Sequence, residues 1–61
     1  MKNVKELYNE MIEMLNLSQY EKLMGGDMSY ESKCLRAKKV SSNRKVHALA
    51  DQIIYIVSKN Q

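Results

Sequence analysis

The chain has 61 residues, of which 44% are hydrophobic and 28% are charged, and its net charge is +3 at pH 7. A chain of this length forms one small domain, residues 1–61, and buries only about 60% of the surface that it exposes when unfolded, so its own core is marginal. Its single cysteine, Cys34, excludes an internal disulfide, and one cysteine with one histidine is too few for a zinc site. We therefore expect a partner chain, most simply a second copy, to complete the core.

The first predicted element is a helix over residues 4–15 with Asn3 as its N-cap. Its apolar residues recur at helical spacing and fill an arc of about 160°, which is wide enough for a stripe that faces a core. They are Val4, Leu7, Tyr8, Met11, Ile12, Met14 and Leu15. The opposite side carries Glu6, Glu10 and Glu13, so we expect an amphipathic helix with an acidic outer face.

A second, short helix is predicted from Ser18 through Met24. Ser18 and Glu21 have the spacing of a capping box. Gly25-Gly26 follows, and glycine supplies the left-handed conformation that commonly ends a helix. No helix breaker separates this segment from the first one, so a single helix that continues through residue 17 is the alternative.

Asp27 or Ser29 is the expected N-cap of a third helix, which runs to about Val40. The following Ser41-Ser42-Asn43 has low helix propensity and is predicted to separate this helix from a fourth; one continuous helix over 29–58 is the alternative. The fourth helix is predicted from a second apolar arc of about 160°, formed by Val46, Leu49, Ala50, Ile53, Ile54, Ile56 and Val57. The sequence therefore predicts an all-α fold, a small bundle of three to four short helices completed by homodimerisation.

Charge is divided unevenly along the chain. Residues 1–32 hold three basic and six acidic side chains, a net −3, whereas residues 33–61 hold seven basic and one acidic side chain, a net +6. Six cations lie close together in the sequence: Lys33, Arg36, Lys38, Lys39, Arg44 and Lys45. One interpretation is a phosphate-binding surface for DNA or RNA, for which six contacts on duplex DNA predict a log–log salt slope of about −5. The alternative is a solvated basic face, or one neutralised by the acidic helix of the same or a second chain.

The same region offers the pieces of a helix–turn–helix: residues 29–40, a Ser-Ser-Asn turn and residues 44–58. In that motif the second helix would present Arg44, Lys45 and His47 to bases. The turn lacks the glycine that is common there. No aromatic residue lies between Lys33 and Lys45, which argues against stacking on single-stranded bases.

Residues with catalytic potential are few. The cations near Cys34 would favour its thiolate, but its position on one side of a helix with Ala37 and Ser41 indicates inert packing. His47 and Asp51 are four positions apart, close enough for a hydrogen bond that is also common in ordinary exposed pairs. We therefore predict that the protein is not an enzyme, and we expect no catalytic residue, metal, cofactor or small-molecule substrate.

Tyr20, Met24 and Met28 flank the Gly-Gly break and are the predicted protein-binding residues. Tyrosine contributes a large amphipathic area, and methionine adapts to irregular partner surfaces. The alternative role for these residue types is to fill the core in place of the absent Phe and Trp. We predict a small regulatory or inhibitory protein that binds another protein stoichiometrically; a nucleic-acid-binding accessory protein or transcriptional regulator is the alternative.

The sequence contains no run of 18 or more apolar residues, and charges interrupt its N-terminal segment every few positions. We therefore expect neither a membrane span nor a secretory signal. The unpaired cysteine and five methionines fit the reducing cytoplasm. The short, Lys- and Asn-rich, proline-free composition resembles in style the accessory proteins of phages and mobile elements.

Overall fold

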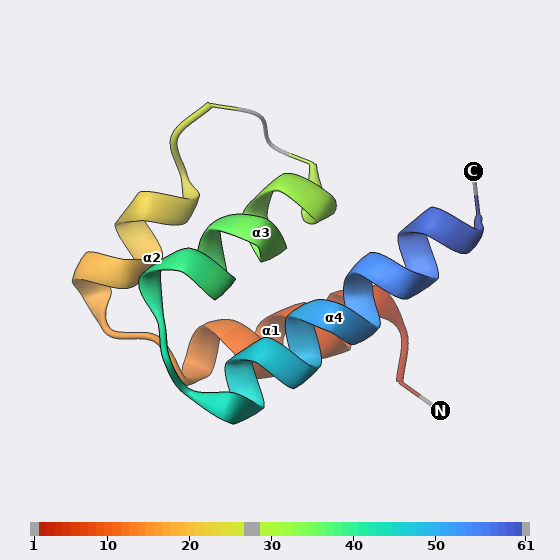
Figure 1. Cartoon of the computed structure of the whole chain (residues 1–61), viewed down its shortest axis with the longest axis horizontal. Coiled ribbons are helices and arrows are strands. Elements are labelled where there is room, and N and C mark those ends of the chain that lie inside the picture. Colours follow the sequence, from red (N-terminus) through yellow and green to blue (C-terminus); the bar gives the residue numbers. More distant parts are fainter. Residues whose placement is uncertain (1, 27–28, 61) are drawn as a thin grey trace.

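Four helices follow one another along the chain, separated by short connections (Figure 1). The computed structural model describes residues 2–26 and 29–60. Its helices are α1 (Val4–Glu13), α2 (Leu17–Leu23), α3 (Tyr30–Val40) and α4 (Arg44–Lys59). These described residues contain no strand, so the predicted all-α bundle of short helices is confirmed. None of the helices in the described part combines the length and the apolar character needed to cross a membrane.

α1 and α3 begin where the sequence predicts. Oδ1 of Asn3 accepts a hydrogen bond from the backbone N–H of Glu6 at 2.9 Å. Oγ of Ser29 accepts one from the backbone N–H of Ser32 at 3.2 Å. Each side chain thereby satisfies one of the N–H groups that the first turn of a helix leaves without a partner. Asp27, the other candidate N-cap of the third helix, lies outside the described residues.

α2 begins at a capping box that differs from the predicted one. Oδ1 of Asn16 accepts from the N–H of Gln19 at 2.8 Å, and Oε1 of Gln19 accepts from the N–H of Asn16 at 3.1 Å. The predicted box of Ser18 and Glu21 is therefore wrong. A single helix through residue 17 is also wrong, since α1 ends at Glu13 and Asn16 has an extended backbone. The amide of Asn16 breaks the helix without Gly or Pro because it caps the next one.

The predicted break between the third and fourth helices is confirmed. Ser41 donates its N–H to the carbonyl of Ala37 at 3.1 Å, the last backbone bond of α3, and then has an extended backbone. Its Oγ accepts from the N–H of Asn43 at 3.1 Å. Oδ1 of Asn43 in turn accepts from the N–H of Lys45 at 2.8 Å and caps α4. These side chains satisfy the backbone groups that a continuous helix would have paired. The alternative of one continuous helix over residues 29–58 is therefore wrong.

α4 is the central helix. Both α1 and α3 pack against it, and α2 packs against α3 (Figure 1). The completely buried side chains come from all four helices: Met11, Leu23, Cys34, Ala37, Val46, Ala50 and Ile53. The radius of gyration is 10.6 Å, which equals the value of about 10.5 Å expected for a compact chain of this length.

Tyr8 connects α1 to α3. Its ring lies edge-on to the ring of Tyr30, with centroids 5.2 Å apart, and the ammonium of Lys33 lies 5.5 Å from its centroid. The side chain is buried, and burial raises the pKa of the Tyr8 hydroxyl. That hydroxyl has no hydrogen-bond partner among the described residues. Tyr8 thus fills the core, which was the predicted alternative to partner binding for residues of this type.

Candidate functional site

Two of the predicted protein-binding residues lie on an exposed apolar face of α2. Leu17, Tyr20 and Met24 are separated by three and four positions and therefore share one side of the helix. Leu17 is 71% exposed and Met24 is 37% exposed, whereas Tyr20 is half-buried. We call these three residues the α2 face. Met28, the third predicted residue, lies outside the described residues.

A hollow of about 410 Å³ adjoins the α2 face at the corner between α1 and α2. It lies where the chain leaves α1 and starts the new helix at Asn16. Its lining consists of Ile12, Glu13, Leu15, Asn16, Leu17 and Tyr20. Leu17 was not among the predicted binding residues. The pattern that would have found it is the Asn16–Gln19 capping box, which places Leu17 in the first turn of a separate helix.

α2 is held on α3 by one buried side chain and by the polar contacts of two others. Leu23 is completely buried. The amide nitrogen of Gln19 donates to the carbonyl oxygen of the last α3 residue at 2.9 Å. The guanidinium of Arg36 donates to the carbonyl oxygen of Gly25 and lies 3.4 Å from that of Lys22, so it satisfies carbonyls at the end of α2. These contacts fix one side of α2 and leave the α2 face outward.

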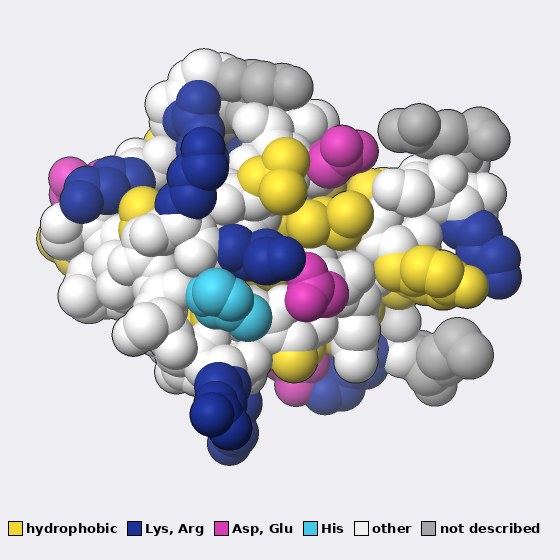
Figure 2. All heavy atoms as spheres, in the orientation of Figure 1, with side chains coloured by type: hydrophobic (Ala, Val, Ile, Leu, Met, Phe, Trp, Pro, Cys, Tyr) yellow, Lys and Arg dark blue, Asp and Glu magenta, His cyan; other side chains and the backbone are white. Residues whose placement is uncertain are grey.

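The six cations of the basic segment differ in what they contact. Three of them make contacts within the chain: Lys33 over Tyr8, Arg36 at the end of α2, and Lys38, whose Nζ lies 2.6 Å from a carboxylate oxygen of Asp51. The other three are exposed and make no ion pair with a described residue: Lys39, Arg44 and Lys45. On the face seen in Figure 2, the basic side chains form separate groups with other side chains between them.

α3 and α4 are arranged as a helical hairpin. Figure 1 shows the two helices side by side and running in opposite directions, whereas the helices of a helix–turn–helix cross at about 90–120°. Arg44 and Lys45 are exposed at the start of α4, but the ring of His47 contacts the backbone carbonyl of Ser41 in the turn. The helix–turn–helix interpretation therefore does not fit this pair of helices.

The residues with catalytic potential each have a structural role. Cys34 is completely buried, and burial raises the pKa of its thiol to about 11, so the expected effect of neighbouring cations on the thiolate is absent. Nε2 of His47 lies 2.6 Å from the carbonyl oxygen of Ser41, whereas Asp51 binds Lys38. The predicted His47–Asp51 pair is therefore not formed. No group of three or more His, Cys, Asp or Glu that could hold a metal ion occurs among residues 2–26 and 29–60.

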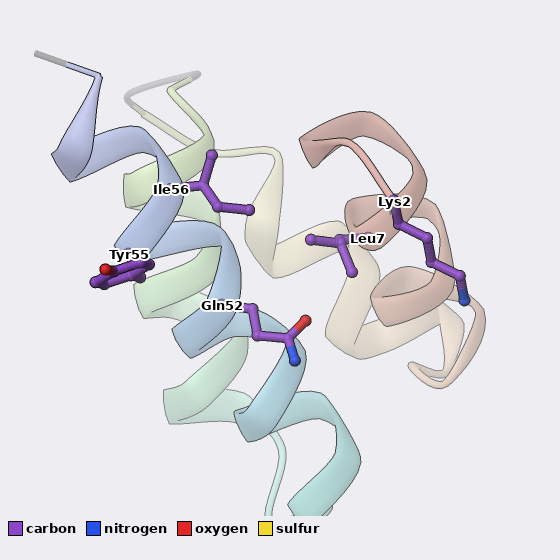
Figure 3. A pocket seen from close by; sticks show the side chains of 5 residues that line it. All are labelled: Lys2, Leu7, Gln52, Tyr55 and Ile56. Carbon is purple, nitrogen blue, oxygen red and sulfur yellow. The ribbon is translucent and has the colours of Figure 1, made fainter.

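A second depression, which the sequence did not predict, runs between α1 and α4. It consists of two hollows of about 330 and 360 Å³ that share Lys2, Leu7 and Gln52, and we call it the α1–α4 groove. Its apolar lining is Leu7, Met14, Ala48, Leu49, Tyr55 and Ile56. Figure 3 shows Leu7 pointing from α1 toward α4, and Gln52 and Ile56 pointing from α4 toward α1.

The α2 face and the α1–α4 groove are thus two exposed apolar surfaces of the described residues. Comparison with protein-family models, with curated proteins and with solved structures yields no match.

Proposed function

We propose that the protein is a non-enzymatic regulator or inhibitor that binds another protein stoichiometrically through the α2 face. We further propose that it acts as a homodimer and in the cytoplasm. The observation that carries the proposal is Leu17, which is 71% exposed and borders a hollow of about 410 Å³. The hollow gives a partner side chain a place to enter, and the exposed leucine gives it apolar surface to cover.

Apolar burial supplies the driving force for this contact. Covering an exposed leucine side chain contributes about 1.5–3 kcal/mol. Tyr20 and Met24 extend the apolar area with residue types that are enriched at interface centres. Because Gln19 and Arg36 already hold α2 on α3, binding requires little ordering of this helix, and less of the gain is lost to conformational entropy.

Affinity capture with matched variants tests the proposal. Tagged wild-type chain should retain one protein in stoichiometric amount from a lysate of the cells that produce it. The double variant Leu17→Gln/Tyr20→Gln should lose that protein, because it keeps the helix but removes the apolar surface. The control is Leu35→Gln on α3, where the leucine is 47% exposed; it should retain the protein. Equal retention by both variants, with unchanged helical circular dichroism, would refute the α2 face.

DNA or RNA binding is the second candidate function. It is favoured by Lys39, Arg44 and Lys45, which are exposed, lack ion-pair partners among the described residues, and lie on either side of the α3–α4 turn. Three phosphate contacts predict a log–log salt slope of about −3 for duplex DNA, instead of the −5 expected for six. Titrations of labelled duplex DNA and RNA at several salt concentrations, from about 100 mM upward, measure that slope. Reversal of the three cations to Glu should abolish binding, whereas Lys59→Glu should preserve it.

A further inference from the structure

We infer that the α1–α4 groove is the contact surface of a symmetric homodimer, in which α4 lies antiparallel to α4 of a second copy with Gln52 at the two-fold axis. The inference rests on the homodimerisation contained in the proposed function and adds the surface and the register. The surface shares no residue with the α2 face, so a dimer of this kind leaves both α2 faces available to partners.

α4 has two apolar sides, although a surface helix normally needs only one. The inward side contains Val46, Ala50 and Ile53, which are completely buried. The side along the groove repeats at intervals of three and four: Lys45, Ala48, Leu49, Gln52, Tyr55 and Ile56 line the groove, and Lys59 follows at the same spacing. Leu49 and Ile56 are half-buried, because they also pack against the core. Tyr55 is 62% exposed, and Ala48 and Gln52 are also exposed. The spacing is that of a helix-pairing seam about two heptads long.

The order of residues in this seam is symmetric about Gln52. Ala48 and Leu49 lie four and three positions before it, Tyr55 and Ile56 lie three and four positions after it, and a lysine lies seven positions away on each side. A two-fold interface needs a surface that is complementary to itself. Antiparallel pairing meets this need, because it sets Ala48 and Leu49 of one chain against Tyr55 and Ile56 of the other.

Gln52 is the polar residue at the middle of the seam. A carboxamide both donates and accepts hydrogen bonds, so two copies of Gln52 facing each other across the axis can satisfy one another. A single polar residue in an apolar seam also selects the register in which this happens. A partner of different sequence would need its own matching amide at this place, which is why the seam favours a second copy.

Glu10 supplies the complementary charge at each end of the seam. Antiparallel pairing brings Lys45 of one chain toward Lys59 of the second copy, and these like charges repel. Glu10 lines the groove together with Lys45, and its side chain is 38% exposed while it binds Lys2 in its own chain. Its carboxylate therefore lies where it can offset part of this repulsion.

The chain exposes enough surface for an interface of standard size. The chain exposes 4301 Å², whereas an unfolded chain of 7.1 kDa exposes about 10,300 Å², so about 58% is buried on folding. A standard interface covers about 800 Å² of each partner. Covering that much would raise the buried fraction to about 66%, which is typical of a domain about twice as long.

Disulfide trapping tests the register. Gln52→Cys should form a covalent dimer under mild oxidation, because a residue at the two-fold axis faces its own copy within disulfide reach. The control is Asp51→Cys, which is also exposed on α4 but one position away and turned by about 100°; it should cross-link at least about 10-fold more slowly. Wild type treated with the same oxidant shows how much covalent dimer the buried Cys34 forms by itself.

Sedimentation equilibrium tests the surface. Wild type should be dimeric, and Tyr55→Glu should raise the dimer dissociation constant by about 30-fold or more, as expected for a central aromatic contact. The control Leu35→Glu on α3 should remain dimeric, and all variants should retain helical circular dichroism. A dimer that Tyr55→Glu leaves intact and Gln52→Cys does not trap would overturn the groove assignment alone. A wild-type chain that stays monomeric up to about 100 µM would overturn homodimerisation itself. The affinity capture experiment tests the α2 face independently of this result.

Discussion

Asn16→Ala tests the residue that separates α1 from α2. The substitution removes the oxygen that accepts the backbone N–H of Gln19 at 2.8 Å. Replacing an asparagine N-cap by alanine costs about 0.5–2 kcal/mol, typically about 1. The reciprocal bond, from the N–H of residue 16 to the side chain of Gln19, can persist. We therefore expect the free energy of unfolding to fall by about 1 kcal/mol.

This loss is large enough to measure in a chain of 61 residues. An unfolding entropy of about 2.1 cal/mol/K per residue gives about 130 cal/mol/K for the chain, so 1 kcal/mol lowers Tm by about 8 °C. Thermal melts followed by circular dichroism report the change. All variants should be compared at one protein concentration, because self-association makes Tm depend on concentration.

The controls distinguish the observed capping box from the predicted one. Ser18→Ala and Glu21→Ala change exposed side chains and should each alter stability by less than about 0.5 kcal/mol. Gln19→Ala should cost more than Asn16→Ala, because Gln19 also donates to the carbonyl of Val40 at 2.9 Å. A Tm that falls for Ser18→Ala and stays unchanged for Asn16→Ala would show that Asn16 does not cap α2.

Three further predictions concern the loop, the core and pH. Gly26 has φ +78°, so Gly26→Ala should cost about 1–2 kcal/mol in urea unfolding, whereas Gly25→Ala should cost less than about 0.5; equal losses would contradict the assigned backbone. Ile53→Ala should cost about 2–5 kcal/mol in the same assay, because the side chain is completely buried. Burial raises the pKa of Cys34 from 9.0 to about 11, so the unfolded thiol ionises first and stability should fall as pH rises from about 9 to 11. Urea midpoints across that range should fall less for Cys34→Ala, and an identical pH dependence in both proteins would show that the thiol does not contribute.

The helices and most of their ends could be predicted because the interactions that set them are local. The caps Asn3 and Ser29 bond to residues three positions away, and the apolar repeats act within a few turns. The start of α2 was misread because two overlapping capping patterns are both acceptable locally. The box that forms contains Gln19, whose side chain also donates to the carbonyl oxygen of Val40, 21 positions away. A pattern of neighbouring residues does not contain this contact.

The candidate binding surfaces were less predictable, since exposure depends on what packs against each helix. Met14 belongs to the predicted inward stripe of the first helix, yet it is 39% exposed and lines the α1–α4 groove. Tyr20 and Met24 were predicted from residue type and position, whereas the exposure of Leu17 and of the α4 residues along the groove became visible only once the helices were placed. Their role in binding stays a prediction.

Local patterns in the amino-acid sequence were enough to predict an all-helical chain, most of its helix breaks and the uneven division of its charge. Which of the charged side chains are engaged by other residues depends on how the helices pack. Lys38 meets Asp51, and Arg36 meets the carbonyl of Gly25, across separations of 13 and 11 positions. Contacts of that kind are made by helix packing, and a one-dimensional pattern of charges does not contain the distances that set them.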